Sequence, residues 1–216
     1  MKKSVSVSIL SADFLELKNE LDKIEKSNAD MLHFDVMDGV FVPNISFGFP
    51  VLDTVNKYTD MHLDVHLMIT DPLKYIDECV KFGADTITIH LESESDTEKA
   101  LDKIKKSGVK AGLSVKPGTP FEDAIPFMDK IDMLLIMTVE PGFGGQSFME
   151  DMLDKIAAAK KYISENNLDV AIEVDGGINN KTGKLVSEAG ADILVAGSYI
   201  FKHSDMNEAV SSLACL

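Results

Sequence analysis

The sequence has no arginine and no tryptophan, and all 21 of its basic residues are lysines. Without a guanidinium group, the chain cannot hold a phosphate by the paired hydrogen bonds that arginine offers. Acidic residues number 36, which leaves a net charge of −15. A chain of this charge repels nucleic acid and anionic membrane surfaces, so neither is expected as a partner.

Cysteine is scarce as well, since Cys79 and Cys215 are the two in the chain and form no C-x-x-C pair. This pattern is unlike a disulfide framework and predicts a reduced compartment. No apolar run approaches the roughly 18 residues of a membrane span, and residues 1–10 lack the apolar segment of a signal peptide. We therefore expect a cytoplasmic protein.

What is present is a globular composition, 45% hydrophobic over 216 residues. A chain of this length can bury one substantial core without disulfides. No stretch rich in proline, glycine or serine and no block of charge divides it. We predict a single domain, residues 1–216.

Short apolar runs alternate along the chain with longer amphipathic stretches. The apolar runs, which predict strands, begin near Val5, Met31, His62, Thr86, Lys110, Met133, Val170 and Asp192. Helical periodicity predicts helices over 15–26, 74–81, 98–106, 149–166 and 182–189. The strands are mostly about 22 to 31 residues apart, which suits one strand, one helix and two short loops.

Eight such units allow either a closed (β/α)8 barrel or a doubly wound open sheet. No G-x-G-x-x-G follows the first strand, and polar and glycine residues stand at the C-terminal ends of many strands. In a barrel those ends meet at one mouth, where barrel enzymes carry their chemistry. We predict an α/β fold of the (β/α)8 TIM barrel type. Three of the strands directly follow an Asn-Ala-Asp or Gly-Ala-Asp turn, at 28–30, 83–85 and 190–192.

Two neighbouring predicted strands carry residues that bind metals. Side chains alternate along a strand, so His33 and Asp35 share one face. On the next strand the residues that share a face are His62, Asp64 and His66. A single strand histidine is usually a hydrogen-bonded core residue, but histidines and a carboxylate at adjacent strand ends suit a divalent metal. Asp175 is a further candidate, since it ends a strand and precedes two glycines.

Glycine gathers in the loops after the last three predicted strands, at 142–145, 176–177 and 197–198. Six of the fourteen glycines lie there. Glycine lets backbone N–H groups approach an anion closely, and barrel enzymes often bind phosphate at the loops after strands seven and eight. One such loop would be only a tight turn. Three in succession predict a phosphate site.

Five motifs, at 8–14, 33–44, 66–68, 141–146 and 173–178, stand in the order found in one known family. On these motifs the chain resembles the ribulose-phosphate 3-epimerase family over nearly its whole length. The match is specific for the family and less so for the substrate, because allulose-6-phosphate 3-epimerases share the metal residues. Those enzymes typically have alanine in place of Gly144, so the sequence of this loop favours the pentulose phosphate.

The resemblance implies a barrel enzyme that interconverts D-ribulose 5-phosphate and D-xylulose 5-phosphate at carbon 3, in the pentose phosphate pathway. It implies one divalent metal ion (Zn, Fe, Mn or Co), no organic cofactor, a small sugar phosphate as ligand, and a homo-oligomer, either dimer or hexamer. The implied metal ligands are His33, Asp35, His66 and Asp175, and the catalytic pair is Asp35 and Asp175. The implied substrate-binding residues are Ser8, His66, Gly142, Phe143, Gly144, Gly145, Asp175, Gly176, Gly177, Gly197 and Ser198. Met37, Met68 and Met137 would form an apolar wall around the reacting carbons.

The chemistry of the two aspartates agrees with this reaction. Epimerisation next to a ketone removes a weakly acidic proton and returns one to the opposite face of a planar enediolate. Two acid–base groups on opposite sides achieve this without a redox cofactor. A divalent ion stabilises the charge that develops. Asp35 and Asp175, on the second and seventh strands, could stand on different sides of the barrel mouth.

Three alternatives remain open. The first is an allulose-6-phosphate 3-epimerase. The second, a metal-free decarboxylase or isomerase, would need a lysine near its acids, and related decarboxylases carry Asp-x-Lys-x-x-Asp where this chain has residues 33–35 as His-Phe-Asp. The third, a non-catalytic phosphate-ligand-binding barrel, leaves no reason for the four implied metal ligands to meet.

Lys116 and Glu140 follow the fifth and sixth strands, where many family members have asparagine. We predict a salt bridge between them, with contact between Lys116 and the phosphate as the alternative. For the other histidines, His62, His90 and His203, we predict ordinary hydrogen-bonded roles. A place beside the metal ligands is the alternative for His90 and its neighbour Glu92.

Overall fold

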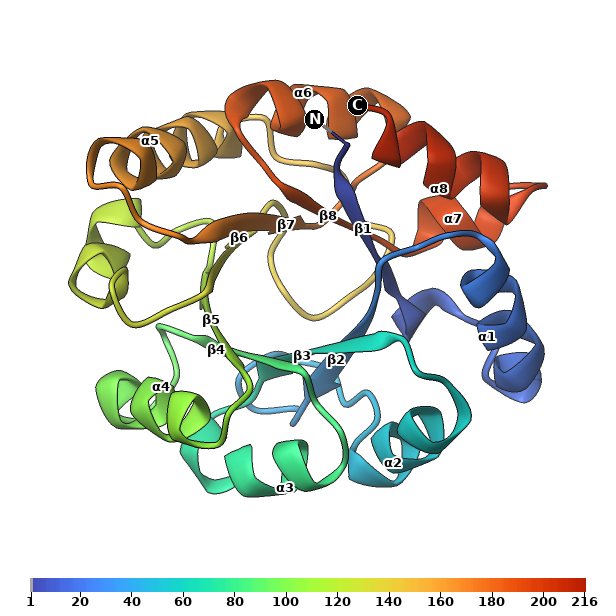
Figure 1. Cartoon of the computed structure of the whole chain (residues 1–216), viewed down its shortest axis with the longest axis horizontal. Helices are drawn as coiled ribbons and strands as arrows, with labels where there is room; N and C mark the ends of the chain where they lie inside the picture. Colours follow the sequence, from blue (N-terminus) through green and yellow to red (C-terminus); the bar gives the residue numbers. More distant parts are fainter. Residues whose placement is uncertain (1) are drawn as a thin grey trace.

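The structure is a computed structural model, and it describes residues 2–216. Eight parallel strands close into a barrel in which each strand pairs with the next and β8 pairs with β1. The strands are β1 (Ser4–Ser8), β2 (Met31–Met37), β3 (His62–Met68), β4 (Thr86–His90), β5 (Lys110–Val115), β6 (Met133–Met137), β7 (Ala171–Asp175) and β8 (Ile193–Ala196). The view down the barrel (Figure 1) shows the strands at the centre and the helices outside them. The predicted (β/α)8 TIM barrel is confirmed.

The helices cover the outside of the barrel. They are α1 (Leu17–Lys26), α2 (Phe49–Tyr58), α3 (Ile76–Lys81), α4 (Thr97–Lys106), α5 (Met152–Glu165), α6 (Asn180–Ala189), α7 (Ser198–Lys202) and α8 (Met206–Ala214). The five predicted helices match α1, α3, α4, α5 and α6, whereas α2, α7 and α8 are absent from the prediction. Of these, α7 spans only five residues, which is too short to show helical periodicity. No helix within residues 2–216 is long and apolar enough to cross a membrane.

One connection departs from the strand–helix repeat. Between β5 and β6 the chain forms a 3-10 helix, η4 (Phe121–Phe127), in place of an α-helix. Pro126 lies inside it, and proline lacks the N–H that an α-helix needs there. The segment still covers the barrel, because Phe121 and Ala124 are buried.

The repeated turn before three strands has two structural functions. Its first residue, Asn28, Gly83 or Gly190, has a positive φ angle of 60°, 93° or 122°, which reverses the chain after a helix. Its aspartate accepts a hydrogen bond from a backbone N–H of the preceding strand. The pairs are Asp30 with Val5 at 2.9 Å, Asp85 with Leu63 at 2.8 Å and Asp192 with Ile172 at 3.0 Å. The repeat therefore aligns the N-terminal ends of neighbouring strands.

The two faces of the barrel wall differ in polarity. Outward-facing residues are apolar and pack under the helices, as Val5, Val7, Leu32, Phe34, Leu63, Val65, Ile87 and Ile89 do. The residues that alternate with them are polar and buried, namely Ser6, Ser8, His33, Asp35, Asp64, His66, Thr88, His90, Ser114 and Glu173. Barrel interiors are usually filled with branched apolar side chains. Burying so many polar groups costs free energy unless they pair with one another or with a ligand. The interior is therefore where a ligand site is expected.

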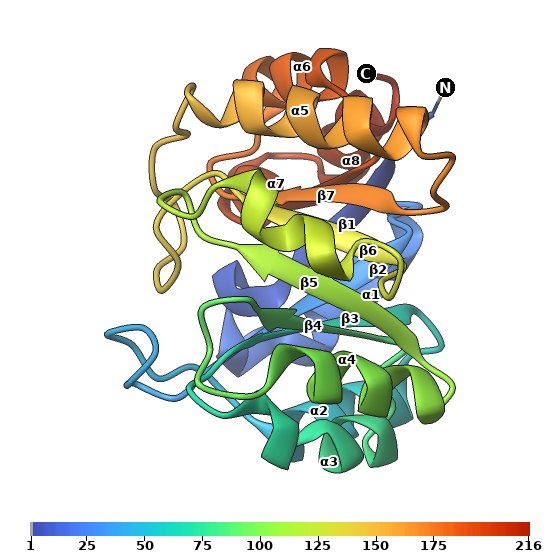
Figure 2. The ribbon, with the colours of Figure 1, turned by 90° about the vertical axis from the view of Figure 1, so that its left-hand side faces the viewer.

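The strand register brings the predicted site residues together at the C-terminal end of the barrel. Asp35 lies opposite His66 in the β2–β3 pair, and Met137 lies opposite Asp175 in the β6–β7 pair. In Figure 2 the loop after β2 and the loop after β6 project beyond the barrel on the same side. This end of the barrel is the mouth.

Candidate active site

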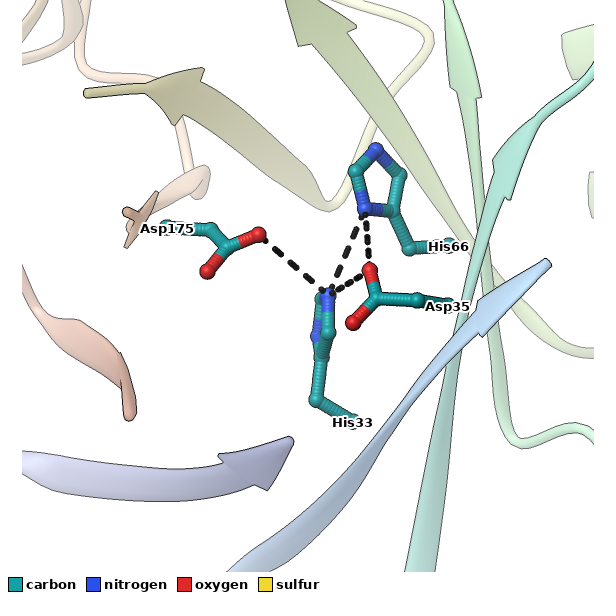
Figure 3. Close-up of side chains that lie close together, drawn as sticks. All are labelled: His33, Asp35, His66 and Asp175. Carbon is teal, nitrogen blue, oxygen red and sulfur yellow. Dashed lines mark hydrogen bonds and ion pairs between the residues drawn. The ribbon is translucent and has the colours of Figure 1, made fainter. Parts of the chain in front are cut away.

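Four predicted side chains meet at the mouth: His33 and Asp35 from β2, His66 from β3 and Asp175 from β7 (Figure 3). Their ligand atoms all lie within 4.8 Å of one another. His33 Nε2 is 3.2 Å from Asp35 Oδ1, 3.3 Å from His66 Nδ1 and 3.9 Å from Asp175 Oδ2. Asp175 points at the cluster from the side opposite Asp35 and His66. It is also the most accessible of the four, with 19% of its side chain exposed.

The spacing and chemistry of these atoms fit a divalent cation. Ligands around a tetrahedral ion with bonds near 2.1 Å stand about 3.4 Å apart. Four of the distances in the cluster run from 3.1 Å, between His66 Nδ1 and Asp35 Oδ1, to 3.9 Å, and all lie within 4.8 Å. Two imidazoles with two carboxylates suit Zn²⁺, Fe²⁺, Mn²⁺ or Co²⁺.

A second acidic group lies against the other side of His33. Asp64 Oδ2 is 2.6 Å from His33 Nδ1 and accepts a hydrogen bond from Ser6 Oγ at 3.2 Å. Asp64 Oδ1 and both oxygens of the fully buried Glu173 have no hydrogen-bond partner among residues 2–216. Burial, and after it the charge of Asp64, raise the pKa of Glu173 well above its ordinary value. The raised pKa favours the protonated, neutral form of Glu173, whose carboxyl lies within 4.8 Å of Asp64 and His33.

The sequence places Asp64 on the strand face of His66 without giving it a role of its own, and Glu173 has no predicted role, although the sequence holds the signal for both. Asp64 is two residues before His66, and Glu173 is two residues before Asp175. Alternation along a strand places each on the same face as its partner, one level deeper in the barrel.

A hydrogen-bonded chain also leads away from His66. His66 Nε2 lies 2.9 Å from His90 Nε2, and His90 Nδ1 lies 3.1 Å from Glu92 Oε2. Both histidines are fully buried. His90 thus occupies the alternative place beside the cluster. The remaining histidines have ordinary hydrogen bonds, as predicted: His62 with Thr86 at 2.8 Å and His203 with the backbone oxygen of Asp205 at 2.8 Å.

The two catalytic candidates have opposite electrostatic surroundings. Burial alone would raise the pKa of Asp35, but the charge and hydrogen bond of His33 lower it. Burial, and after it the charge of Asp35, raise the pKa of Asp175 to about 6. One carboxyl with a low pKa beside one with a raised pKa is an arrangement that supplies a base and an acid near neutral pH.

A cavity opens above the cluster. Its empty space, counting the part open to solvent, is about 540 Å³. The predicted residues that line it are Ser8, Asp35, Met37, Met68, Met137, Gly142, Phe143, Gly144, Gly145, Asp175, Gly176, Gly177, Gly197 and Ser198. His33 and His66 do not line it, because they lie beneath it. Ser11 and Gln146 line it without a predicted role, although both fall inside the family motifs.

One side of the cavity is rich in free backbone donors. The N–H groups of Gly144, Gly145, Gly177 and Ser198 have no hydrogen-bond acceptor among residues 2–216. Gly145 and Gly177 have φ angles of 74° and 67°, which other residues rarely adopt. A Cβ on Gly177 would lie 2.6 Å from the backbone nitrogen of Phe148, so glycine is also needed for close packing there. Such a set of donors can hold an anion without any cationic side chain.

The loops after β2 and β6 are joined across the mouth. Asn44 Nδ2 donates to the backbone oxygen of Gly142 at 2.8 Å. Asp38 holds the base of the first loop, since it accepts from the N–H groups of Val40 and Phe41, both at 2.8 Å, and from the N–H of Thr70 at 2.7 Å. The cavity is therefore bounded by a braced loop.

The predicted salt bridge between Lys116 and Glu140 is wrong, because no ion pair joins them within residues 2–216. Lys116 Nζ lies instead over the ring of Phe41, 3.7 Å from its centroid. Glu140 is exposed. The lysine that braces the loop after β5 is Lys155, whose Nζ donates to the carbonyls of 116, 117 and 119 at 2.9, 2.8 and 2.7 Å. Lys116 also does not line the cavity.

Solved structures with a similar fold include a 3-hexulose-6-phosphate synthase, with a TM-score of 0.71 and 20% identity over 100% of this chain and 99% of that one. Another is KGPDC from Streptococcus mutans, with a TM-score of 0.72 and 13% identity over 99% of this chain and 96% of that one. At these identities the likeness concerns the fold alone.

Sequence comparison is more specific. The chain is 47% identical to the ribulose-phosphate 3-epimerase of Bacillus subtilis over 97% of both chains. It is 43% identical to the cytoplasmic isoform of Oryza sativa, over 97% of this chain and 92% of the relative. Residues 4–201 match the family model described as the ribulose-phosphate 3 epimerase family. The chain belongs to the ribulose-phosphate 3-epimerase family of enzymes.

Proposed function

We propose that this protein interconverts D-ribulose 5-phosphate and D-xylulose 5-phosphate by moving a proton at carbon 3, through an enediolate. The observation that carries the proposal is the placement of Asp35 and Asp175. Both line one cavity, and they approach it from opposite sides. An epimerase with two bases needs this arrangement, since one face loses a proton and the other gains one.

We assign His33, Asp35, His66 and Asp175 as the ligands of one divalent metal ion. The mixed donor set and the spacing of its atoms fit such an ion. When bound, the ion would supply a positive charge that stabilises the enediolate. It would also reduce the repulsion between the two carboxylates.

The chain's own residues then have separate roles. Asp35 takes or returns a proton on one face of the sugar, and Asp175 does so on the other. Ser8 Oγ donates to Asp35 Oδ2 at 2.8 Å, which orients that carboxylate. Met37, Met68 and Met137 line the cavity as an apolar wall that excludes water from the reacting carbons.

The phosphate of the substrate would be held by the free N–H groups of Gly144, Gly145, Gly177 and Ser198. These donors lie in the loops after β6, β7 and β8, the last two being the loops where barrel enzymes commonly bind phosphate. No arginine is required. This assignment agrees with the binding roles predicted for the 142–145, 176–177 and 197–198 loops.

The test is an assay of epimerisation on metal-depleted and metal-reconstituted protein, with ribulose 5-phosphate and allulose 6-phosphate as substrates. We expect turnover of the pentulose phosphate, loss on chelation, and recovery with Zn²⁺, Fe²⁺, Mn²⁺ or Co²⁺. Activity that is indifferent to chelation would refute the metal assignment. Faster turnover of allulose 6-phosphate would favour the hexulose alternative, and phosphate-ligand binding without turnover of either sugar would favour a non-catalytic barrel.

A further inference from the structure

The hydrogen-bonded chain that runs from His66 through His90 to Glu92 is not used by the proposed mechanism, yet it ends in a firmly held carboxylate. Glu92 accepts at Oε2 from His90. At Oε1 it accepts from the backbone N–H of Lys116 at 2.7 Å and from the Thr119 hydroxyl. Burial works against ionisation, but the hydrogen bonds from His90, Thr119 and Lys116 lower the pKa of Glu92 to about 2. Glu92 is therefore an acceptor at both oxygens.

Because Glu92 can only accept, it sets the direction of both hydrogen bonds that join His66, His90 and Glu92. A neutral imidazole has one N–H, so a donor on one nitrogen leaves a lone pair on the other. His90 must donate from Nδ1 to Glu92, which leaves its Nε2 as an acceptor. His66 must then donate from Nε2 to His90. A metal-binding imidazole is neutral, so His66 can ligate through Nδ1 only with its proton on Nε2, which is the direction that Glu92 sets.

The outcome at His66 is a lone pair on Nδ1. That atom faces the cluster, 3.1 Å from Asp35 Oδ1 and 3.3 Å from His33 Nε2. A lone pair so close to a carboxylate oxygen is repelled unless a cation lies between them. The rings cannot easily turn to avoid this, because His90 packs between Phe41 and His66 with centroid distances of 4.8 and 5.0 Å.

We propose that Glu92, acting through His90, is a positioning residue that fixes the tautomer of His66 and so directs its Nδ1 lone pair at the metal. The inference rests on the proposed metal site. It also connects that site to the loop after β5, since Glu92 is held by the N–H of Lys116 and by Thr119. Residues that orient a metal-binding histidine commonly change affinity by about 10- to 100-fold when they are lost.

Glu92→Gln is a sharp test because the structure determines how the new amide must lie. The backbone N–H of Lys116 requires the amide oxygen, so the amide NH2 faces His90 Nδ1. His90 would then carry its proton on Nε2, and His66 would carry its proton on Nδ1. Every hydrogen bond of the chain reverses, and His66 loses its ligating lone pair.

The tautomer of His66 is read from the nitrogen chemical shifts of the metal-free protein, and metal affinity is read by competition of Zn²⁺ or Mn²⁺ with a chelator. Glu92→Gln should move the proton of His66 from Nε2 to Nδ1 and weaken affinity by about 10- to 100-fold. Thr119→Val is the matched control, because it removes one hydrogen bond to Glu92 but leaves its carboxylate facing His90. We expect it to keep the tautomer and to change affinity less than threefold, that is, less than about 0.7 kcal/mol.

If Glu92→Gln does not fold, a second pair of variants tests His90, which stands between His66 and Glu92. His90→Gln can still accept from His66 and donate to Glu92, so affinity should be nearly retained, whereas His90→Leu can do neither and should lose it. An unchanged His66 tautomer in Glu92→Gln, or equal losses of metal affinity in the two His90 variants, would overturn this inference and leave the proposed function standing. Wild-type protein that binds no metal would refute the proposed function instead, and with it the inferred role toward the metal.

Discussion

Asp35 and Asp175 are chemically identical side chains that the barrel places in different surroundings. Asp35 is buried between two histidines and accepts from Ser8. Asp175 ends its strand at the cavity, and its nearest ring nitrogen is the His33 Nε2 at 3.9 Å. Contact with imidazole nitrogens favours the charged form, while burial beside a like charge disfavours it. The difference between the two aspartates is thus a product of position.

The first prediction concerns these two aspartates. Asp35→Asn and Asp175→Asn should each lower epimerisation by at least about 10²-fold, because an amide cannot transfer the proton at carbon 3. The measurement is turnover of ribulose 5-phosphate, with metal content determined for each variant. Asp102→Asn, on an aspartate of α4 whose side chain is 52% exposed, is the control and should retain full activity. Wild-type turnover in either active-site variant would refute the two-base scheme.

At the scale of elements, the turns between helices and strands position the site from a distance. Gly190 ends α6 with a φ of 122°, and Asp192 then anchors β7 through the N–H of Ile172. Lys160 from α5 also reaches Asp192, at 2.9 Å. These contacts secure the N-terminal end of the strand whose other end carries Asp175.

Gly190 and Gly108 offer a matched comparison of such turns. Both have positive φ, but a Cβ on Gly190 would lie 2.6 Å from Lys160 Cγ, whereas a Cβ on Gly108 meets nothing within 4 Å. Gly108→Ala should cost about 1–2 kcal/mol for the backbone conformation alone. Gly190→Ala adds a steric clash and should cost more than Gly108→Ala. Urea denaturation of both variants measures the difference, and equal losses would contradict this interpretation.

At the scale of the whole molecule, the barrel separates two kinds of core. The outer layer between strands and helices is apolar and supplies the main hydrophobic burial. The inner layer is mostly polar, and it carries the candidate site at the mouth. Folding of the outer layer secures the inner one, because both faces belong to the same strands.

The two cysteines test the packing of the outer layer, since one is buried in it and the other is exposed. Cys79 lies in α3 and is fully buried, and this burial raises the pKa of its thiol to about 12. Cys215 is exposed. At pH 8 the native protein should react with iodoacetamide at Cys215, while Cys79 reacts about 10³-fold more slowly, since the thiolate is the nucleophile.

Peptide mass analysis over time identifies which thiol reacts. Cys215→Ser should abolish the fast phase, and urea should bring Cys79 to an ordinary rate. Equal rates at the two thiols in native protein would contradict the described packing of α3. A slow reaction at Cys215 would contradict its exposure.

Much of the site could be predicted because its residues follow strand alternation. His33 with Asp35, and His66 with Met68, stand at i and i+2 on strands whose order along the chain is also their order in the barrel. The glycine loops could likewise be predicted from composition. The position of Lys116 could not, because it depends on the ring of Phe41, which comes from a different loop.

The sequence by itself determined the alternation of strands and helices and the list of residues at the strand ends, because periodicity is a local property that survives in any packing. Only the tertiary structure decided how those residues are paired. Asp64 against His33, Glu173 against Asp64, and the chain from His66 to Glu92 all join different strands at distances of a few ångströms. Such contacts depend on the closure and register of the barrel, which set the distances between side chains far apart in the sequence.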